Sequence, residues 1–129
     1  MDYYLGHKFT MDILELGQIG EQQACAFLEE KGLKLLARNY RCLFGEIDLI
    51  MRDQDELVFV EVRKRTHSQF ATPIESITLT KQRKIIKTAI HYLQKLHPFE
   101  EPQYRFDVIG IANNTIEWIK DAFTTDHFN

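Results

Sequence analysis

The segment Gly45–Arg65 constrains the fold most, because it has the pattern of two strands joined by a tight turn. Two apolar runs, Ile47–Met51 and Leu57–Val62, flank the polar stretch Asp53–Glu56. β-Branched and aromatic residues on both sides of turn residues are typical of a β-hairpin. The second run is apolar on both faces for most of its length, which is typical of a central strand covered by helices on both sides.

Two carboxylates interrupt these apolar runs. If the polar stretch closes as a two-residue turn, Asp48 lies directly opposite Glu61, and Glu46 lies opposite Arg63 on the same face. Directly opposed Cβ atoms are about 4.5–5.5 Å apart, and like charges placed there repel each other. A cation would offset this repulsion. The alternative interpretation is a Glu46–Arg63 ion pair beside two half-exposed strand carboxylates.

The register of this hairpin depends on the chemistry of its turn. The central residues would be Gln54 and Asp55, whereas two-residue turns favour Asn-Gly or Asp-Gly. A register shifted by one residue therefore stays open, and it would place Asp48 and Glu61 on opposite faces of the sheet.

Composition limits the class of protein and its partners. The chain has 129 residues, 44% apolar and 27% charged, which suits one globular domain over residues 1–129 with a loosely ordered arm at residues 1–11. The net charge of −3 means that nucleic-acid binding would need a local basic patch. No long apolar segment or secretory signal is present, so we expect no membrane segment and a cytoplasmic location. Cys25 and Cys42 are expected to be reduced thiols.

Periodicity predicts two helices and five strands. Apolar residues at three- and four-residue steps predict a helix over Asp12–Lys31, which Gly32 ends. A second helix begins at Leu79, with Thr80 as its N-cap, and stops at His97. The predicted strands are Leu33–Tyr40, the two arms of the hairpin, Tyr104–Ala112 and Thr115–Lys120, with a tight turn at Asn113-Asn114. We expect an α/β domain in the order α-β-β-β-α-β-β, with a mixed central sheet flanked by helices.

A basic segment follows the third predicted strand. Between Arg63 and Lys87 there are seven Lys or Arg residues and one acid, Glu75. Cations near a helix N-terminus are electrostatically unfavourable, so an anionic partner such as DNA would explain them, with binding that weakens as salt increases. The alternative is a solvated helix face. The candidate nucleic-acid-binding residues are Arg38, Arg65, Lys81, Arg83 and Lys84.

The candidate catalytic residues are Glu21, Asp48, Glu61 and Arg63. Mg²⁺ prefers oxygen ligands and typically takes one or two protein carboxylates, which Asp48 and Glu61 would supply as metal ligands. Arg63 faces the same side of the strand as Glu61, where it would stabilise charge on a phosphate or orient water. Glu21 lies at the edge of the first helix's apolar stripe, and its alternative role is that of a solvated glutamate.

Short motifs along the chain, together with Lys81, occur in an order that carries a family resemblance. They are Gly17-Gln18-Ile19-Gly20-Glu21, Leu36-Ala37-Arg38-Asn39-Tyr40-Arg41, Gly45-Glu46-Ile47-Asp48-Leu49-Ile50, Phe59-Val60-Glu61-Val62, Ala89-Ile90-His91-Tyr92-Leu93, Arg105-Phe106-Asp107-Val108 and Asp121-Ala122-Phe123. This series resembles the YraN-like family of uncharacterised bacterial proteins. The resemblance implies a restriction-endonuclease-like fold of the PD-(D/E)XK type, distantly similar to archaeal Holliday junction resolvases.

The resemblance also implies roles for individual residues. In such nucleases an aspartate and a glutamate hold Mg²⁺, a lysine two residues after the glutamate helps to activate water, and a first-helix glutamate completes the site. Carried over, these roles fall on Asp48, Glu61, Arg63 and Glu21. The implied function is a Mg²⁺- or Mn²⁺-dependent endonuclease that hydrolyses DNA phosphodiesters, including those of branched or junction DNA. Resolvases act as dimers, so homodimerisation is a further expectation.

Arg63 departs from the family pattern, because Glu-Val-Lys is Glu61-Val62-Arg63 here. Arginine keeps its proton and has a larger, planar head. Lys64 points to the opposite face of the strand, whereas Lys81 at the start of the second helix is a candidate to reach the site. Three outcomes stay open: an active enzyme that uses Arg63 or Lys81, a weakened enzyme, or a non-catalytic nucleic-acid-binding protein. A protein-interaction domain that retains the fold is a further alternative.

Overall fold

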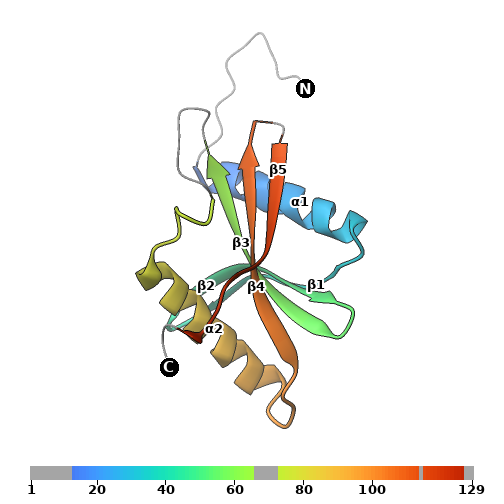
Figure 1. Cartoon of the computed structure of the whole chain (residues 1–129), viewed down its shortest axis with the longest axis vertical. Coiled ribbons are helices and arrows are strands. Elements are labelled where there is room, and N and C mark those ends of the chain that lie inside the picture. The colour runs from blue at the N-terminus through green and yellow to red at the C-terminus, as the bar shows by residue number, and fades with distance from the viewer. Residues whose placement is uncertain (1–12, 66–72, 114, 127–129) are drawn as a thin grey trace.

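The structure, a computed structural model, describes residues 13–65, 73–113 and 115–126 (Figure 1). The predicted N-terminal arm at residues 1–11 lies outside these ranges. The elements are α1 (Ile13–Glu30), β1 (Lys34–Cys42), β2 (Gly45–Asp53), β3 (Glu56–Arg65), α2 (Leu79–Leu96), β4 (Gln103–Ala112) and β5 (Thr115–Phe123). Each predicted helix and strand is therefore present, with ends that differ by up to three residues.

One mixed sheet contains all five strands, and its spatial order follows the chain from β1 to β5. β3 and β4 are parallel, whereas the other neighbouring pairs are antiparallel. Two parallel neighbours need a crossover connection, and α2 lies in the connection between β3 and β4. The expected mixed sheet with flanking helices is confirmed.

The two helices cover opposite faces of the sheet. Alternate side chains of a strand point to opposite faces, and those of β3 divide between two buried clusters. Phe59 packs with Ile86 of α2, whereas Val60 packs with Leu28 of α1. β3 lies between β2 and β4, so its prediction as a covered central strand is confirmed.

Gly32 ends α1, as predicted. Its φ of +100° is a conformation that favours glycine. The Gly32 amide donates to the Glu29 carbonyl at 3.0 Å, and the Leu33 amide donates to the Leu28 carbonyl at 3.0 Å. This pair of hydrogen bonds is a Schellman motif, which satisfies the last carbonyls of the helix.

The N-cap of α2 is Thr78, and the prediction of Thr80 was wrong. Thr78 has an extended backbone, and its hydroxyl accepts a hydrogen bond from the Lys81 amide at 3.1 Å. Thr80 cannot be the cap because it already lies within the first helical turn, which begins at Leu79. The cap fixes the start of α2 and with it the position of Lys81.

Neither described helix combines the length and apolarity needed to cross a lipid bilayer.

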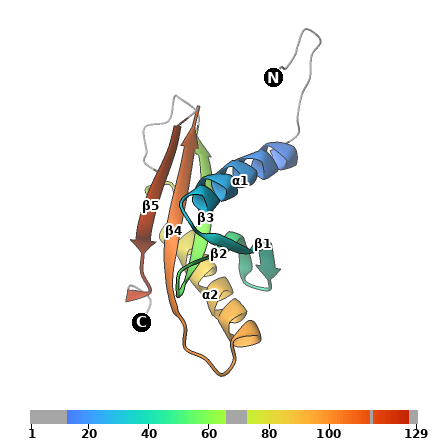
Figure 2. The ribbon, with the colours of Figure 1, turned by 90° about the vertical axis from the view of Figure 1, so that its right-hand side faces the viewer.

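The β2–β3 hairpin has the predicted register next to its turn. Its pairs run from Asp53–Glu56 to Leu49–Val60, and Gln54 at the turn has a positive φ of 58°. The ladder stops one residue before Asp48 and Glu61. From that point β2 continues along β1 and β3 continues along β4, and β1 and β2 project away from β3–β5 (Figure 2).

The β4–β5 hairpin also closes as predicted. Ala112 pairs with Thr115, and Asn113 has a positive φ of 57°, which Asn tolerates well; Asn114 lies outside the described residues. β5 continues to Phe123, which is three residues past the predicted end. Its ring is buried and stacks on Phe106 with centroids 5.0 Å apart, so the end of β5 packs against the core.

Candidate active site

Asp48 and Glu61 meet where β2 and β3 separate. The Oδ2 atom of Asp48 accepts a hydrogen bond from the Val62 amide at 2.8 Å. A side chain of β2 thus bonds the backbone of β3 at the point where the main-chain ladder has stopped. The Asp48 and Glu61 carboxyls are also hydrogen-bonded to each other. The separation of the strands therefore creates the space that these two side chains fill.

The two carboxyls share a hydrogen bond in a buried place, so full ionisation of both is unfavourable. Glu61 is only 6% exposed. Burial and the charge of Glu61 raise the pKa of Asp48 to about 7, although the Val62 amide opposes this shift. Burial also raises the pKa of Glu61, which Lys81 and Arg63 counteract. The shared hydrogen bond favours a protonated Asp48 and an ionised Glu61.

Two cations from different elements approach the same oxygen of Glu61. The Nε atom of Arg63 on β3 lies 3.6 Å from Oε2, and the Nζ atom of Lys81 on α2 lies 3.8 Å from it. Both distances suit an ion pair but are too long for a hydrogen bond. Arg63 Nε is buried and has no hydrogen-bond acceptor among the residues that the structure describes, an arrangement that costs about 1–3 kcal/mol. An oxygen of a bound phosphate would satisfy this donor.

Glu21 reaches the site from α1 through Asn39 of β1. The Asn39 amide nitrogen donates to Glu21 Oε1 at 2.9 Å and to Glu46 Oε2 at 3.0 Å. Burial raises the pKa of Glu21, the Asn39 hydrogen bond opposes this shift, and the charges of Asp48 and Glu46 add to it. The structure therefore brings all four predicted catalytic residues together, with Glu21 next to Asp48.

Comparisons with known proteins place this site in a family. The model of the uncharacterised protein family UPF0102 matches residues 20–111. A UPF0102 protein of Psychromonas ingrahamii is 54% identical over 109 residues, which cover 83% of this chain and 88% of the relative. One from Coxiella burnetii is 46% identical over 114 residues, covering 88% and 95%. The chain belongs to the UPF0102 family. This finding confirms the resemblance to the YraN-like family of uncharacterised bacterial proteins.

Asn39 and Glu46 have roles in this UPF0102 protein that the sequence did not reveal. Glu46 was predicted to lie opposite Arg63, but it contacts Asn39 and Arg41, with Arg41 Nε 3.4 Å from Glu46 Oε2. The reason is that this part of β2 pairs with β1. Asn39 has a positive φ of 50° inside a strand. Asparagine is depleted in strands. An asparagine within a predicted strand was therefore the sequence signal that pointed to a special role for Asn39.

The donor set of the UPF0102 site fits a hard divalent cation held by two carboxylates. Among the described residues, no group of three or more His, Cys, Asp or Glu side chains is arranged to hold a metal ion. Mg²⁺ takes one or two protein carboxylates and keeps several waters, so Asp48 and Glu61 are sufficient. A cation that replaced their shared proton would relieve the repulsion between them. Glu21 is instead held by Asn39.

The candidate nucleic-acid-binding residues whose side chains the structure describes do not converge on one place. Lys81 lies at the site, and Arg83 and Lys84 are exposed in the following part of α2. Arg38 lies on the other side of the sheet, beside a thiol of α1. The side chain of Arg65 lies outside the described residues. The basic surface next to the carboxylates is therefore formed by α2.

Proposed function

We propose that this UPF0102 protein is a metal-dependent endonuclease with a restriction-endonuclease-like fold of the PD-(D/E)XK type, which hydrolyses DNA phosphodiesters. The observation that carries the proposal is the Asp48–Glu61 pair, with Glu61 buried and Asp48 partly buried, and with Arg63 and Lys81 on one Glu61 oxygen. Two carboxylates for a divalent ion, beside cations for a phosphate, are a sufficient set for phosphodiester hydrolysis. The resemblance to Holliday junction resolvases extends the proposal to branched DNA and to a homodimer.

Each residue has a separate role in this proposal. Asp48 and Glu61 would hold Mg²⁺ or Mn²⁺, which polarises a phosphate oxygen and lowers the pKa of bound water. The Val62 amide fixes the Asp48 carboxylate by the 2.8 Å hydrogen bond. Arg63 offers its buried Nε donor to a phosphate oxygen. Glu21 is a positioning residue, because it acts on Asp48 by charge and hydrogen bonding.

Lys81 is better suited than Arg63 to hold the attacking water. An ammonium group has three rotatable donors on a flexible stem, whereas a guanidinium presents its donors in a fixed plane. Lys81 brings an amine within 3.8 Å of the same Glu61 oxygen that Arg63, at the position of the lysine in Glu-Val-Lys, approaches at 3.6 Å. Lys64 is not an alternative, because its side chain lies against Gly20 of α1 on the opposite face.

Cleavage of supercoiled plasmid in Mg²⁺ and in Mn²⁺ tests this proposal. We expect nicked product from the wild type, and about 10²–10³-fold slower cleavage by Asp48→Asn and by Lys81→Met. Lys95→Met, in the last turn of α2, is the matched control and should cleave as the wild type does. Equal rates for the wild type and Asp48→Asn, or no cleavage with either metal, would contradict the proposal.

The alternative is a nucleic-acid-binding protein that does not cleave, and the Arg63 departure favours it. It predicts that added salt weakens DNA binding and that loss of Lys81 and Lys84 does the same. It also predicts that no metal ion supports cleavage. A titration of Mn²⁺ followed by calorimetry separates the two, because only the nuclease requires that Glu61→Gln reduce metal binding. Absence of both DNA binding and metal uptake would favour a protein-interaction domain.

A further inference from the structure

The turn between β1 and β2 exposes two apolar residues where polar ones are usual. Leu43 is 92% exposed and Phe44 is 42% exposed. They are the two central residues of a hairpin turn that the Cys42–Gly45 pair closes. Such turns favour Asn, Asp and Gly, so neither the turn geometry nor core packing explains this choice. Exposed apolar side chains at such a turn are available for contact with another molecule.

The Leu43-Phe44 turn is held against α2. Gly45 has a φ of +153°, and a Cβ added there would meet the Thr88 hydroxyl at 3.3 Å, so the backbone lies close to the helix. The Phe44 ring is 6.5 Å from the ring of His91, and Lys87 Nζ is 5.9 Å from the Phe44 ring. The apolar turn and the basic face of α2 therefore form one continuous surface.

This surface leads directly to the candidate active site. Lys81, Lys84 and Lys87 follow one another along α2, and the last two are exposed while the first lies at Glu61. Six residues of helix span about 9 Å, and stacked nucleotides rise about 3.4 Å each. A strand whose phosphate lies at Lys81 would thus place a base two or three nucleotides away beside Phe44.

A row of lysines with an exposed apolar turn at one end suits nucleic acid, because lysines pair with phosphates and rings stack on bases. A second copy of this chain fits less well, since a two-fold contact would bring the lysines of α2 close to each other. We infer that the Leu43-Phe44 turn contacts unstacked bases, and that the substrate is DNA with an open base step beside the cleaved phosphate. This inference rests on the nucleic-acid binding of the proposed function.

An open base step distinguishes gaps, single strands and branch points from continuous duplex. In continuous duplex the base faces are already stacked, and an apolar side chain must first separate them. The turn would therefore give a preference for interrupted DNA, while the lysines of α2 would contribute equally to all forms through their phosphates.

Fluorescence anisotropy in EDTA, with a labelled duplex and the same duplex carrying a short central gap, tests this inference. The wild type should bind the gapped DNA about tenfold more tightly, and the Leu43→Ser/Phe44→Ser variant should lose about tenfold on gapped DNA and less than twofold on duplex. Phe99→Ser is the matched control, because Phe99 is 98% exposed but follows the other end of α2. Thermal unfolding verifies that the variants are folded.

The outcomes separate this inference from the proposed hydrolysis. Equal binding of the wild type and the turn variant to gapped DNA would overturn the inference, even if Asp48→Asn abolishes cleavage. If the preference for gapped DNA depends on the turn but no cleavage occurs, the inference is supported and the proposed hydrolysis is refuted. Sedimentation velocity covers the remaining outcome. If the wild type is a dimer, the variant is a monomer and the variant binds DNA normally, the turn contacts a second copy and the inference is wrong.

Discussion

Asp48 carries an electrostatic conflict that its neighbours only partly resolve. Its partly buried carboxyl lies near the charges of Glu61 and Glu46, and the contact that opposes their effect is the Val62 amide. Because the pKa of Asp48 is raised to about 7, the folded protein keeps a proton between the carboxyls that the unfolded chain releases at lower pH. A bound divalent ion would take the place of that proton, so metal affinity and proton release are linked.

The pH dependence of stability tests this description of Asp48. Its pKa rises from an ordinary value of 3.8 to about 7 on folding. The contribution to stability is therefore complete below about pH 4 and is lost as pH rises through 7. Asp48→Asn keeps an acceptor for Val62 and removes the ionisation, so we expect it to be more stable than the wild type by on the order of 2–4 kcal/mol at pH 8.

Urea unfolding in EDTA between pH 5 and pH 8 measures this difference. The gap in unfolding free energy between Asp48→Asn and the wild type should widen as pH rises. Parallel pH profiles for the two proteins would show that Asp48 ionises normally. Mn²⁺ provides the control, because it should stabilise the wild type and have little effect on Asp48→Asn.

At the scale of elements, the site exists because two strands that pair at their turn separate four residues later. β2 follows β1 beyond Leu49, and β3 follows β4 beyond Val60. On β4, Gly110 pairs with Arg63 and is buried. A Cβ added at Gly110 would overlap the ring of Pro73, which belongs to the segment that leads into α2. The absence of a side chain at Gly110 thus lets this segment lie close to the sheet.

Gly110→Ala should therefore destabilise the protein by about 1–3 kcal/mol, because Pro73 must move. Cleavage should also fall, since α2 carries Lys81. Gly20→Ala is the matched control, because its added Cβ meets only the flexible side chain of Lys64, at 3.0 Å, and alanine favours a helix over glycine. Urea denaturation measures both variants. If Gly110→Ala is as stable as Gly20→Ala, the close approach of Pro73 is not a constraint.

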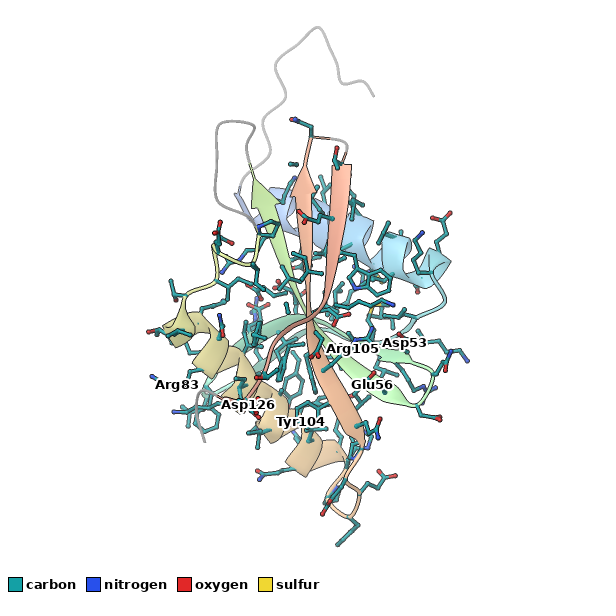
Figure 3. The ribbon with its side chains drawn as sticks, viewed as in Figure 1. Asp53, Glu56, Arg83, Tyr104, Arg105 and Asp126 are labelled. Carbon is teal, nitrogen blue, oxygen red and sulfur yellow. The ribbon has the colours of Figure 1, made fainter. Side chains whose placement is uncertain are left out.

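At the scale of the whole molecule, an ion network at the closed end of the β2–β3 hairpin joins four strands. Arg105 lies 3.0 Å from Asp53, 2.9 Å from Glu56 and 2.9 Å from Asp107, and Figure 3 shows Arg105 close to Asp53 and Glu56. Asp107 is fully buried and also accepts hydrogen bonds from the Trp118 indole and a β5 amide, both at 2.9 Å. The network fixes the hairpin against β4 and β5.

Asp107→Ala should destabilise the protein by about 3–5 kcal/mol, because it removes the buried partner of Arg105. Asp107→Asn should lose less, since it keeps an acceptor for Trp118 or for the β5 amide. Asp55→Ala, at the exposed tip of the same hairpin, is the control and should change stability by less than about 0.5 kcal/mol. Thermal and urea unfolding measure the series. A stable Asp107→Ala would mean that the network adds nothing to the fold.

The sequence by itself determined the features that depend on neighbouring residues. Alternation and the polar turn predicted the β2–β3 register next to the turn, with a shift of one residue as the alternative, and Gly32 predicted the end of α1, because strand pairing near a turn and helix capping are local. The candidate carboxylates Asp48 and Glu61 followed from that register. Their catalytic role stays a prediction.

Only the tertiary structure decided how distant residues complete the site. Asn39 bridges Glu21 and Glu46, and Lys81 meets Glu61, through contacts between elements that are far apart in the chain. Such contacts depend on where α1 and α2 pack on the twisted sheet and on where β2 leaves β3. No local pattern encodes these distances, because they result from the burial of the whole core.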